Sequence, residues 1–124
     1  MFDLTAEEAR LLLKIAMMAT GRNRFRSAAK ILAVLERFRP DQVSVATAKA
    51  IALMSATKFA EAVDYIDSEG LAKFPDSAML RAFKGMALVR MDRPEDARGP
   101  LEEAASQTDD PVAARMAQDL LGDL

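Results

Sequence analysis

The sequence predicts an all-α protein made of repeated helical hairpins, and three observations support this expectation. The chain holds 24 alanines and 8 methionines against 5 glycines and 5 prolines, and alanine and methionine are among the best helix formers. Ala28, Ala62 and Ala97 stand 34 and 35 residues apart, each after a short turn-like segment. The helix expected around each of these alanines ends near a proline, and proline cannot continue a helix because it lacks the N–H. The three prolines are Pro40, Pro75 and Pro111.

Seven helices are expected along the chain, at about residues 5–20, 24–38, 42–55, 59–73, 77–91, 94–107 and 111–121. Thr5 and Glu8 have the spacing of a capping box at the start of the first helix. Asp76 is expected to cap the fifth helix, and Asp110 followed by Pro111 is expected to open the last one.

This 34-residue period of helix, turn, helix and proline resembles the tetratricopeptide repeat (TPR) family. The resemblance covers a single domain over residues 1–124, with repeats at about 9–42, 43–76 and 78–111 and a capping helix at 111–121. It implies three helical hairpins in a right-handed α-solenoid. The residues at the signature positions are Leu12, Ile15, Ala16, Ala19, Phe25, Ala28, Leu32, Leu35, Pro40, Ala50, Leu53, Phe59, Ala62, Ile66, Gly85, Leu88, Ala97, Leu101 and Ala104.

The chain departs from a regular repeat in three ways. The second repeat carries about one extra residue near Gly70. Gly99-Pro100 lies inside the sixth helix and predicts a bend there, because an interior proline kinks or breaks a helix. Charged residues occupy three positions that are usually apolar, so the first helices of repeats two and three are expected to be rotated. These residues are Lys49, Arg81 and Lys84.

Composition excludes most catalytic chemistry. Without cysteine or histidine, the usual zinc, haem and iron–sulfur ligand sets and the common nucleophile–base pairs cannot be assembled. The acidic pairs Glu102-Glu103 and Asp109-Asp110 are adjacent along a helix or at its start, so they are not expected to converge on one pocket. We therefore expect no enzyme activity, no cofactor and no metal.

The charge is unevenly spread. Residues 1–50 carry nine basic and five acidic side chains, whereas residues 51–124 carry eight and 14. A solvated outer helix face accounts for the basic excess better than a nucleic-acid footprint does. The acidic start of the chain is unlike a secretory signal peptide, and the apolar runs are too short to span a bilayer. We expect a cytoplasmic protein that binds neither nucleic acid nor membrane.

In the TPR family the first helix of each hairpin lines a concave groove. The resemblance places thirteen side chains in that groove. They are Arg10, Leu13, Met17 and Thr20 of the first repeat, Ser44, Thr47, Ile51 and Met54 of the second, and Met79, Ala82, Met86, Val89 and Arg90 of the third. This set is rich in methionine, which suits surfaces that accommodate varied apolar partners. Leu13 and Met17 stand where relatives that grip acidic chaperone tails carry clamp residues, which disfavours that ligand. The other interpretation is that these apolar side chains belong to the core.

A narrower resemblance is to the small TPR-like chaperones of bacterial type III secretion, and in particular to the needle-subunit chaperones. It rests on residues 15–21, 28–36 and 51–62. It implies a cytoplasmic chaperone that holds an amphipathic helix of a secreted subunit, often with a small helical co-chaperone. Chaperones of translocator proteins are a close second. The alternative from another class is a TPR scaffold or homo-oligomerisation module, such as a homodimer, with no chaperone role.

Overall fold

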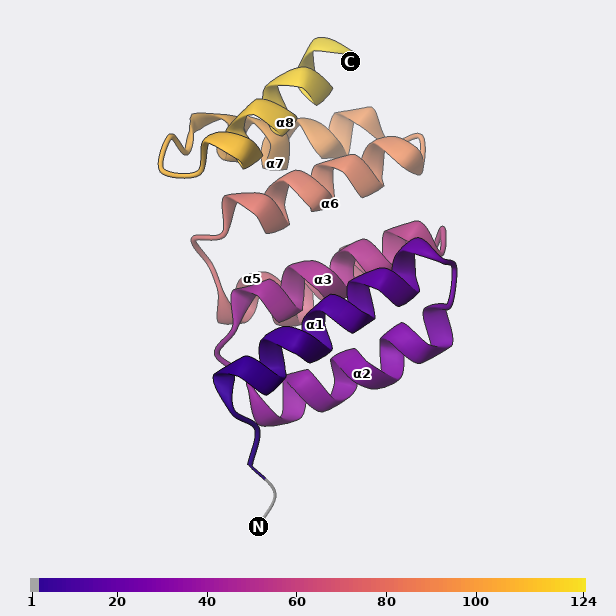
Figure 1. Ribbon diagram of the computed structural model, residues 1–124. Coiled ribbons are helices and arrows are strands. Elements are labelled where there is room, and N and C mark those ends of the chain that lie inside the picture. Colours follow the sequence, from indigo (N-terminus) through magenta and orange to yellow (C-terminus); the bar gives the residue numbers. More distant parts are fainter. Residues whose placement is uncertain (1–2) are drawn as a thin grey trace. The chain divides into compact units, whose positions relative to one another are not determined.

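The computed structural model describes residues 3–124, and every regular element in that range is helical (Figure 1). Met1 and Phe2, the first residues of the acidic start, lie outside the described residues. The chain divides into two compact units, the first ending at Thr57 and the second running from Lys58 to Leu124. The expectation of an all-α protein is confirmed.

The first unit contains three helices, α1 (Ala6–Gly21), α2 (Phe25–Phe38) and α3 (Val43–Ser55), and each packs against the other two. The capping box at the start of α1 is confirmed: the N–H of Glu8 donates to Thr5 Oγ1 at 3.1 Å, and the N–H of Thr5 donates to Glu8 Oε1 at 3.0 Å. The core of this unit is built from Leu4, which precedes α1, and from apolar side chains of all three helices. The core residues are Leu4, Ala16, Leu32, Leu35, Val45, Ala48 and Ala52.

The second unit begins with one continuous helix made of α4 (Phe59–Tyr65), a π-helical turn η1 (Ile66–Gly70) and α5 (Leu71–Lys73). It continues with α6 (Ala78–Arg90), α7 (Pro94–Ser106) and α8 (Pro111–Gly122). The central helix is α6, which packs against α4, η1, α7 and α8. The core lies between α6, α7 and α8 and is rich in alanine, which lets the helices approach closely. Its residues are Ala78, Ala82, Leu88, Ala97, Leu101, Ala104, Ala113 and Ala117.

The internal repeat also appears in the backbone of the turns. Asn23, Thr57 and Asp92 have positive φ angles of 60°, 60° and 61°, and they stand 34 and 35 residues apart, as the three alanines do. Among the described residues these are the non-glycine positions with positive φ. Asparagine and aspartate tolerate this left-handed conformation better than most residues. The same turn therefore recurs at the same place in each repeat.

The extra residue of the second repeat lies in the π-helical turn. One turn of i→i+5 hydrogen bonds can accommodate a single residue inserted into an α-helix. The helical segments before and after that turn then present the same faces to their neighbours. Gly70 ends this turn, and a Cβ on it would lie 3.2 Å from Leu80 Cδ1. The irregularity in the repeat length is thus confined to η1.

The charged residues at usually apolar positions each form an ion pair with a neighbouring helix. Lys49 Nζ lies 3.0 Å from Glu36 Oε1 of α2, and Lys84 Nζ lies 2.7 Å from Asp67 Oδ1 of η1. Arg81 Nε lies 2.9 Å from Oε2 of a glutamate of α7. Pairing with a carboxylate lets these side chains sit at the edges of helix–helix contacts.

One expected cap is wrong, and the interior proline does not break its helix. The N-cap of α6 is Ser77, whose hydroxyl accepts from the N–H of Leu80 at 3.2 Å, so Asp76 is not the cap. Asp76 lies one residue before the N-cap, and its carbonyl accepts from the side chain of Gln107. The helix α7 continues through Pro100 without interruption. Asp110 caps α8 as expected.

Candidate functional site on the first unit

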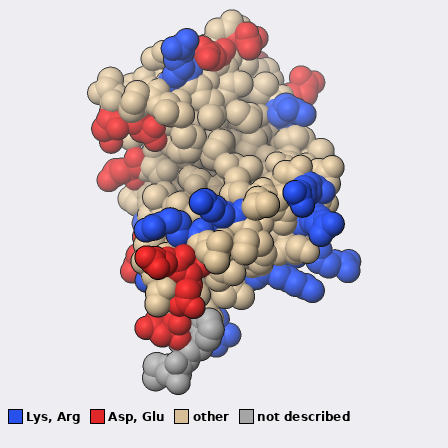
Figure 2. All heavy atoms as spheres, in the orientation of Figure 1, with Lys and Arg blue, Asp and Glu red and all other residues tan. Residues whose placement is uncertain are grey.

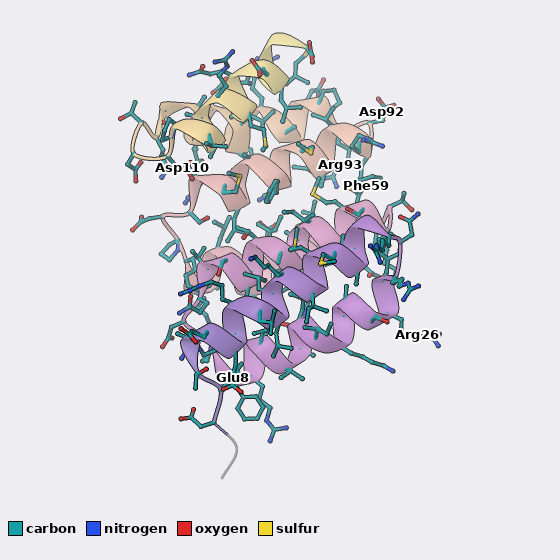
Figure 3. The ribbon with its side chains drawn as sticks, viewed as in Figure 1. Glu8, Arg26, Phe59, Asp92, Arg93 and Asp110 are labelled. Atoms are coloured by element: carbon teal, nitrogen blue, oxygen red, sulfur yellow. The ribbon has the colours of Figure 1, made fainter. Side chains whose placement is uncertain are left out.

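The groove positions of α6 are largely part of the second unit's core. Ala82 is fully buried, and Met79 and Val89 are half-buried against the α6–α7–α8 core. The guanidinium of Arg90 lies over the ring of Phe59, 5.2 Å from its centroid (Figure 3). Met86 is half-buried. Because α6 has helices on several sides, the wide apolar surface predicted for it is used within the protein.

The groove positions of α1 and α3 are less enclosed. Leu13 and Met17 are half-buried and pack at the edge of the first unit's core. Thr47, Ile51 and Met54 of α3 are also half-buried. Thr20 is buried, and its hydroxyl donates to the carbonyl of Ala16 at 2.9 Å, so it offers nothing to a partner.

An open hollow of about 460 Å³ follows α1, and most of its walls are apolar. In the space-filling view, acidic side chains gather at the start of α1, and uncharged side chains cover much of the surface beyond it (Figure 2). The hollow is lined by Arg10, Leu13, Lys14, Met17 and Met18.

A second cavity, of about 240 Å³, lies where the first half of α1 meets the end of α2 and the start of α3. It shares Arg10 and Leu13 with the open hollow, so the two lie next to each other. We call these two cavities, together with the half-buried groove positions Thr47, Ile51 and Met54 of α3, the α1/α3 face. The second cavity is lined by Ala6, Ala9, Arg10, Leu13, Leu35, Arg39, Gln42, Ser44 and Val45.

The α1/α3 face belongs to a unit with an excess of basic side chains. The first unit carries nine basic and five acidic side chains, and among its described residues Lys49 is the basic side chain that forms an ion pair. Arg39 Nε is buried and has no hydrogen-bond partner, and it is the one buried side-chain nitrogen or oxygen between residues 3 and 124 without one. Burying such a donor without a partner costs about 1–3 kcal/mol.

The structure also exposes apolar side chains of α1 that the groove positions did not include. Leu11 is 59% exposed, Ile15 is 42% exposed and Met18 is 57% exposed. Their spacing of four and three residues places them on one side of the helix. We call them the α1 stripe. The sequence signal was present in this spacing, but Ile15 was assigned as a repeat-signature residue and the other two were not singled out.

Residues 3–124 contain no cluster of three or more acidic side chains placed to hold a metal ion. The clearest pKa shift is at Glu8, where the hydrogen bonds from the backbone and side chain of Thr5 lower the pKa of the carboxyl. That shift belongs to the helix cap. None of the helices described here is both long and apolar enough to cross a membrane.

Comparison with models of known protein families, with curated proteins and with solved structures gives no match for this chain. Its function must therefore be argued from the α1/α3 face.

Proposed function

We propose that this chain is a TPR-like binding protein that holds an amphipathic helix of a protein partner on the α1/α3 face and performs no catalysis. The observation that supports this most directly is the open apolar hollow along α1, whose walls include two adjacent methionines. Methionine is flexible and polarizable, so a surface built from it adapts to different apolar side chains. A partner helix would place its apolar positions against Leu13 and Met17 of α1 and Thr47, Ile51 and Met54 of α3.

The size of the hydrophobic contribution is consistent with such a role. Each large apolar side chain of the partner that is fully buried contributes roughly 1.5–3 kcal/mol, and helix-in-groove binding uses three or four such anchors. Part of that gain is offset by the loss of translational, rotational and side-chain freedom on association. We therefore expect the partner helix to bind this face with moderate affinity.

The partner we propose is a subunit of a type III secretion apparatus, and the role is that of a cytoplasmic chaperone. The resemblance to the needle-subunit chaperones supports this choice. A subunit built to polymerise has an apolar assembly surface, and covering that surface before secretion blocks premature assembly. A small helical co-chaperone would complete the complex.

The test is capture of a partner by the tagged chain from its native organism, followed by mass identification of what stays bound. Met17→Asp and Ile51→Asp are expected to abolish capture while the helical circular-dichroism signal is kept. Val112→Asp is the matched control, since Val112 is 66% exposed on α8 and lies outside the α1/α3 face. If both α1/α3 variants capture the same partner as the wild type, the proposed face is wrong.

A scaffold or homo-oligomerisation role is the second candidate, and the α1 stripe favours it. Apolar side chains as exposed as Leu11, Ile15 and Met18 are stabilised when a second surface covers them. Light scattering separates the two candidates. A stable homodimer that Ile15→Asp converts to monomer, and that captures no other protein, supports the scaffold. A monomer that captures a secretion subunit supports the chaperone.

A further inference from the structure

The enclosed end of the α1/α3 face has a different chemistry from its open end. The cavity between α1, α2 and α3 is lined by two arginines that are far apart in sequence, Arg10 of α1, which is exposed, and Arg39 at the end of α2, which is half-buried. The amide of Gln42 and the hydroxyl of Ser44 also line it, and they can donate further hydrogen bonds. No carboxylate is among the lining residues, so the positive charge of this cavity is not balanced within it.

The acidic residues of the first unit are placed elsewhere. Glu36 pairs with Lys49, and Glu8 accepts the hydrogen bond that closes the helix cap. Asp3, Glu7 and Asp41 are exposed and do not line the cavity. Within the described residues, neither Arg10 nor Arg39 forms an ion pair.

The buried Nε–H of Arg39 has no acceptor within residues 3–124, so it can donate to a group bound in the cavity. Buried polar groups in folded proteins nearly always have a hydrogen-bond partner, and the exceptions often mark an absent water or ion. A water molecule would satisfy the N–H but would leave the positive charges of the lining arginines without a counter-ion in the cavity. An anion satisfies the donor and balances the charge, and the planar guanidinium fork matches a carboxylate or phosphate group.

The other residues that line the cavity distinguish between a carboxylate and a phosphate. Five of the nine lining residues are apolar, namely Ala6, Ala9, Leu13, Leu35 and Val45, and Arg10 and Leu13 also line the apolar hollow along α1. A strongly hydrated phosphate gains nothing from such walls. A carboxylate attached to an apolar chain places its charge between the arginines and its chain in the hollow.

We infer that this cavity binds a carboxylate carried at the end of an apolar segment, and that in the complex this group belongs to the partner helix. The second half of this inference rests on the proposed function. The carboxylate would fix the direction of the partner, with its acidic end at the start of α3 and its apolar side chains along α1. An acidic side chain and a free C-terminus are the two sources of such a group.

The direct test uses the full-length, ¹⁵N-labelled protein and hexanoate as the probe, with hexanamide as the uncharged control. We expect hexanoate to shift the NMR signal of the Arg39 Nε–H in a saturable way, while hexanamide leaves it in place. Because this measurement is made on the wild-type protein, it does not depend on a variant being folded. The inference is overturned by an unsaturable or absent shift, by an equal shift with hexanamide, or by tighter binding of inorganic phosphate than of hexanoate.

Three variants then assign the site. Arg39→Gln is expected to weaken hexanoate binding by about tenfold or more, as loss of a charge-assisted hydrogen bond predicts, and Arg10→Gln to weaken it as well. Arg26→Gln is the matched control, because Arg26 lies at the opposite end of the α1–α2 hairpin from Glu8 (Figure 3). Equal affinity in the Arg39→Gln and Arg26→Gln variants would show that the anion binds elsewhere.

Peptides distinguish the source of the carboxylate and separate this inference from the proposed function. The probes are an amphipathic helical peptide of leucine, methionine, alanine and lysine with a free C-terminus, its C-terminal amide, and the amide with one glutamate at the same end. Tighter binding of either acidic form supports the inference and names the source, and equal binding of all three overturns the partner's carboxylate. Binding of hexanoate but of no peptide leaves the carboxylate site standing and refutes the proposed function.

Discussion

Replacing Gly85 by alanine should destabilise the second unit, although alanine is the better helix former. Gly85 lies in the middle of α6 and is buried against α7. A Cβ built on it would lie 2.4 Å from Cδ2 and 2.5 Å from Cγ of Leu101. Real Cβ atoms do not approach this closely, and Leu101 is fully buried, so its side chain has no solvent to move into. One of the two helices must shift.

The expected size follows from two opposing terms. Gly→Ala in a helix interior gains up to about 1 kcal/mol of intrinsic propensity. Overpacking a well-packed core costs about 1–3 kcal/mol. We expect the second term to be larger, with a net loss of about 1–2 kcal/mol in the free energy of unfolding. For a chain of this length that corresponds to a fall in Tm of roughly 3–10 °C.

The assay is urea unfolding followed by circular dichroism, with Gly21→Ala as the control. A Cβ at Gly21 would meet no atom within 4 Å, so that variant should match the wild type or exceed it slightly. A double-mutant cycle with Leu101→Ala locates the strain, because the cost of Leu101→Ala should fall by about 1–3 kcal/mol in the Gly85→Ala background. A stable Gly85→Ala variant, or an additive cycle, would refute the proposed close contact.

Three further predictions concern helix ends and the π-helical turn. Ser77→Ala should lower stability by about 1 kcal/mol through loss of the α6 cap, whereas Asp76→Ala should be nearly neutral, as measured by chemical unfolding. The folded-state pKa of Glu8 is lowered, so its stabilising contribution is present above the ordinary carboxyl pKa and is lost as pH falls through the folded value. NMR titration should find this lowered pKa, and Thr5→Val should raise it toward the ordinary value; an unchanged pKa would contradict the cap's role. Deleting Ser68 should turn η1 into regular α-helix and leave the protein folded, whereas a one-residue deletion in the middle of α2 should unfold the first unit, which thermal unfolding can distinguish.

Helix positions were largely predictable because their signals are local. The expected and observed helices agree to within one residue at nearly every boundary. The capping box, the prolines at helix starts and the recurring turns each act over a few residues, so they can be identified without knowing the tertiary structure. The one cap that was assigned wrongly shows the limit: Asp76 and Ser77 are both good N-cap residues, and the backbone of the turn chooses between them.

The candidate site was less predictable because exposure depends on which helices are neighbours. The groove positions on α6 and on α1 have similar apolar patterns, yet α6 is packed by α4, η1, α7 and α8 whereas α1 is packed by α2 and α3. A helical wheel does not show how many other helices pack against a given helix, so it cannot distinguish a core face from a binding face. The charges of Lys49 and Lys84 are likewise explained only by the tertiary structure, because their carboxylate partners lie on other helical segments.

The sequence alone thus determined that the protein is all-α and where its helices begin and end, because helix propensity and capping act locally. The tertiary structure decided which apolar side chains are core and which are surface. It also brought Arg10 and Arg39 to one cavity from positions 29 residues apart. That placement depends on how α1, α2 and α3 pack, which no local pattern specifies.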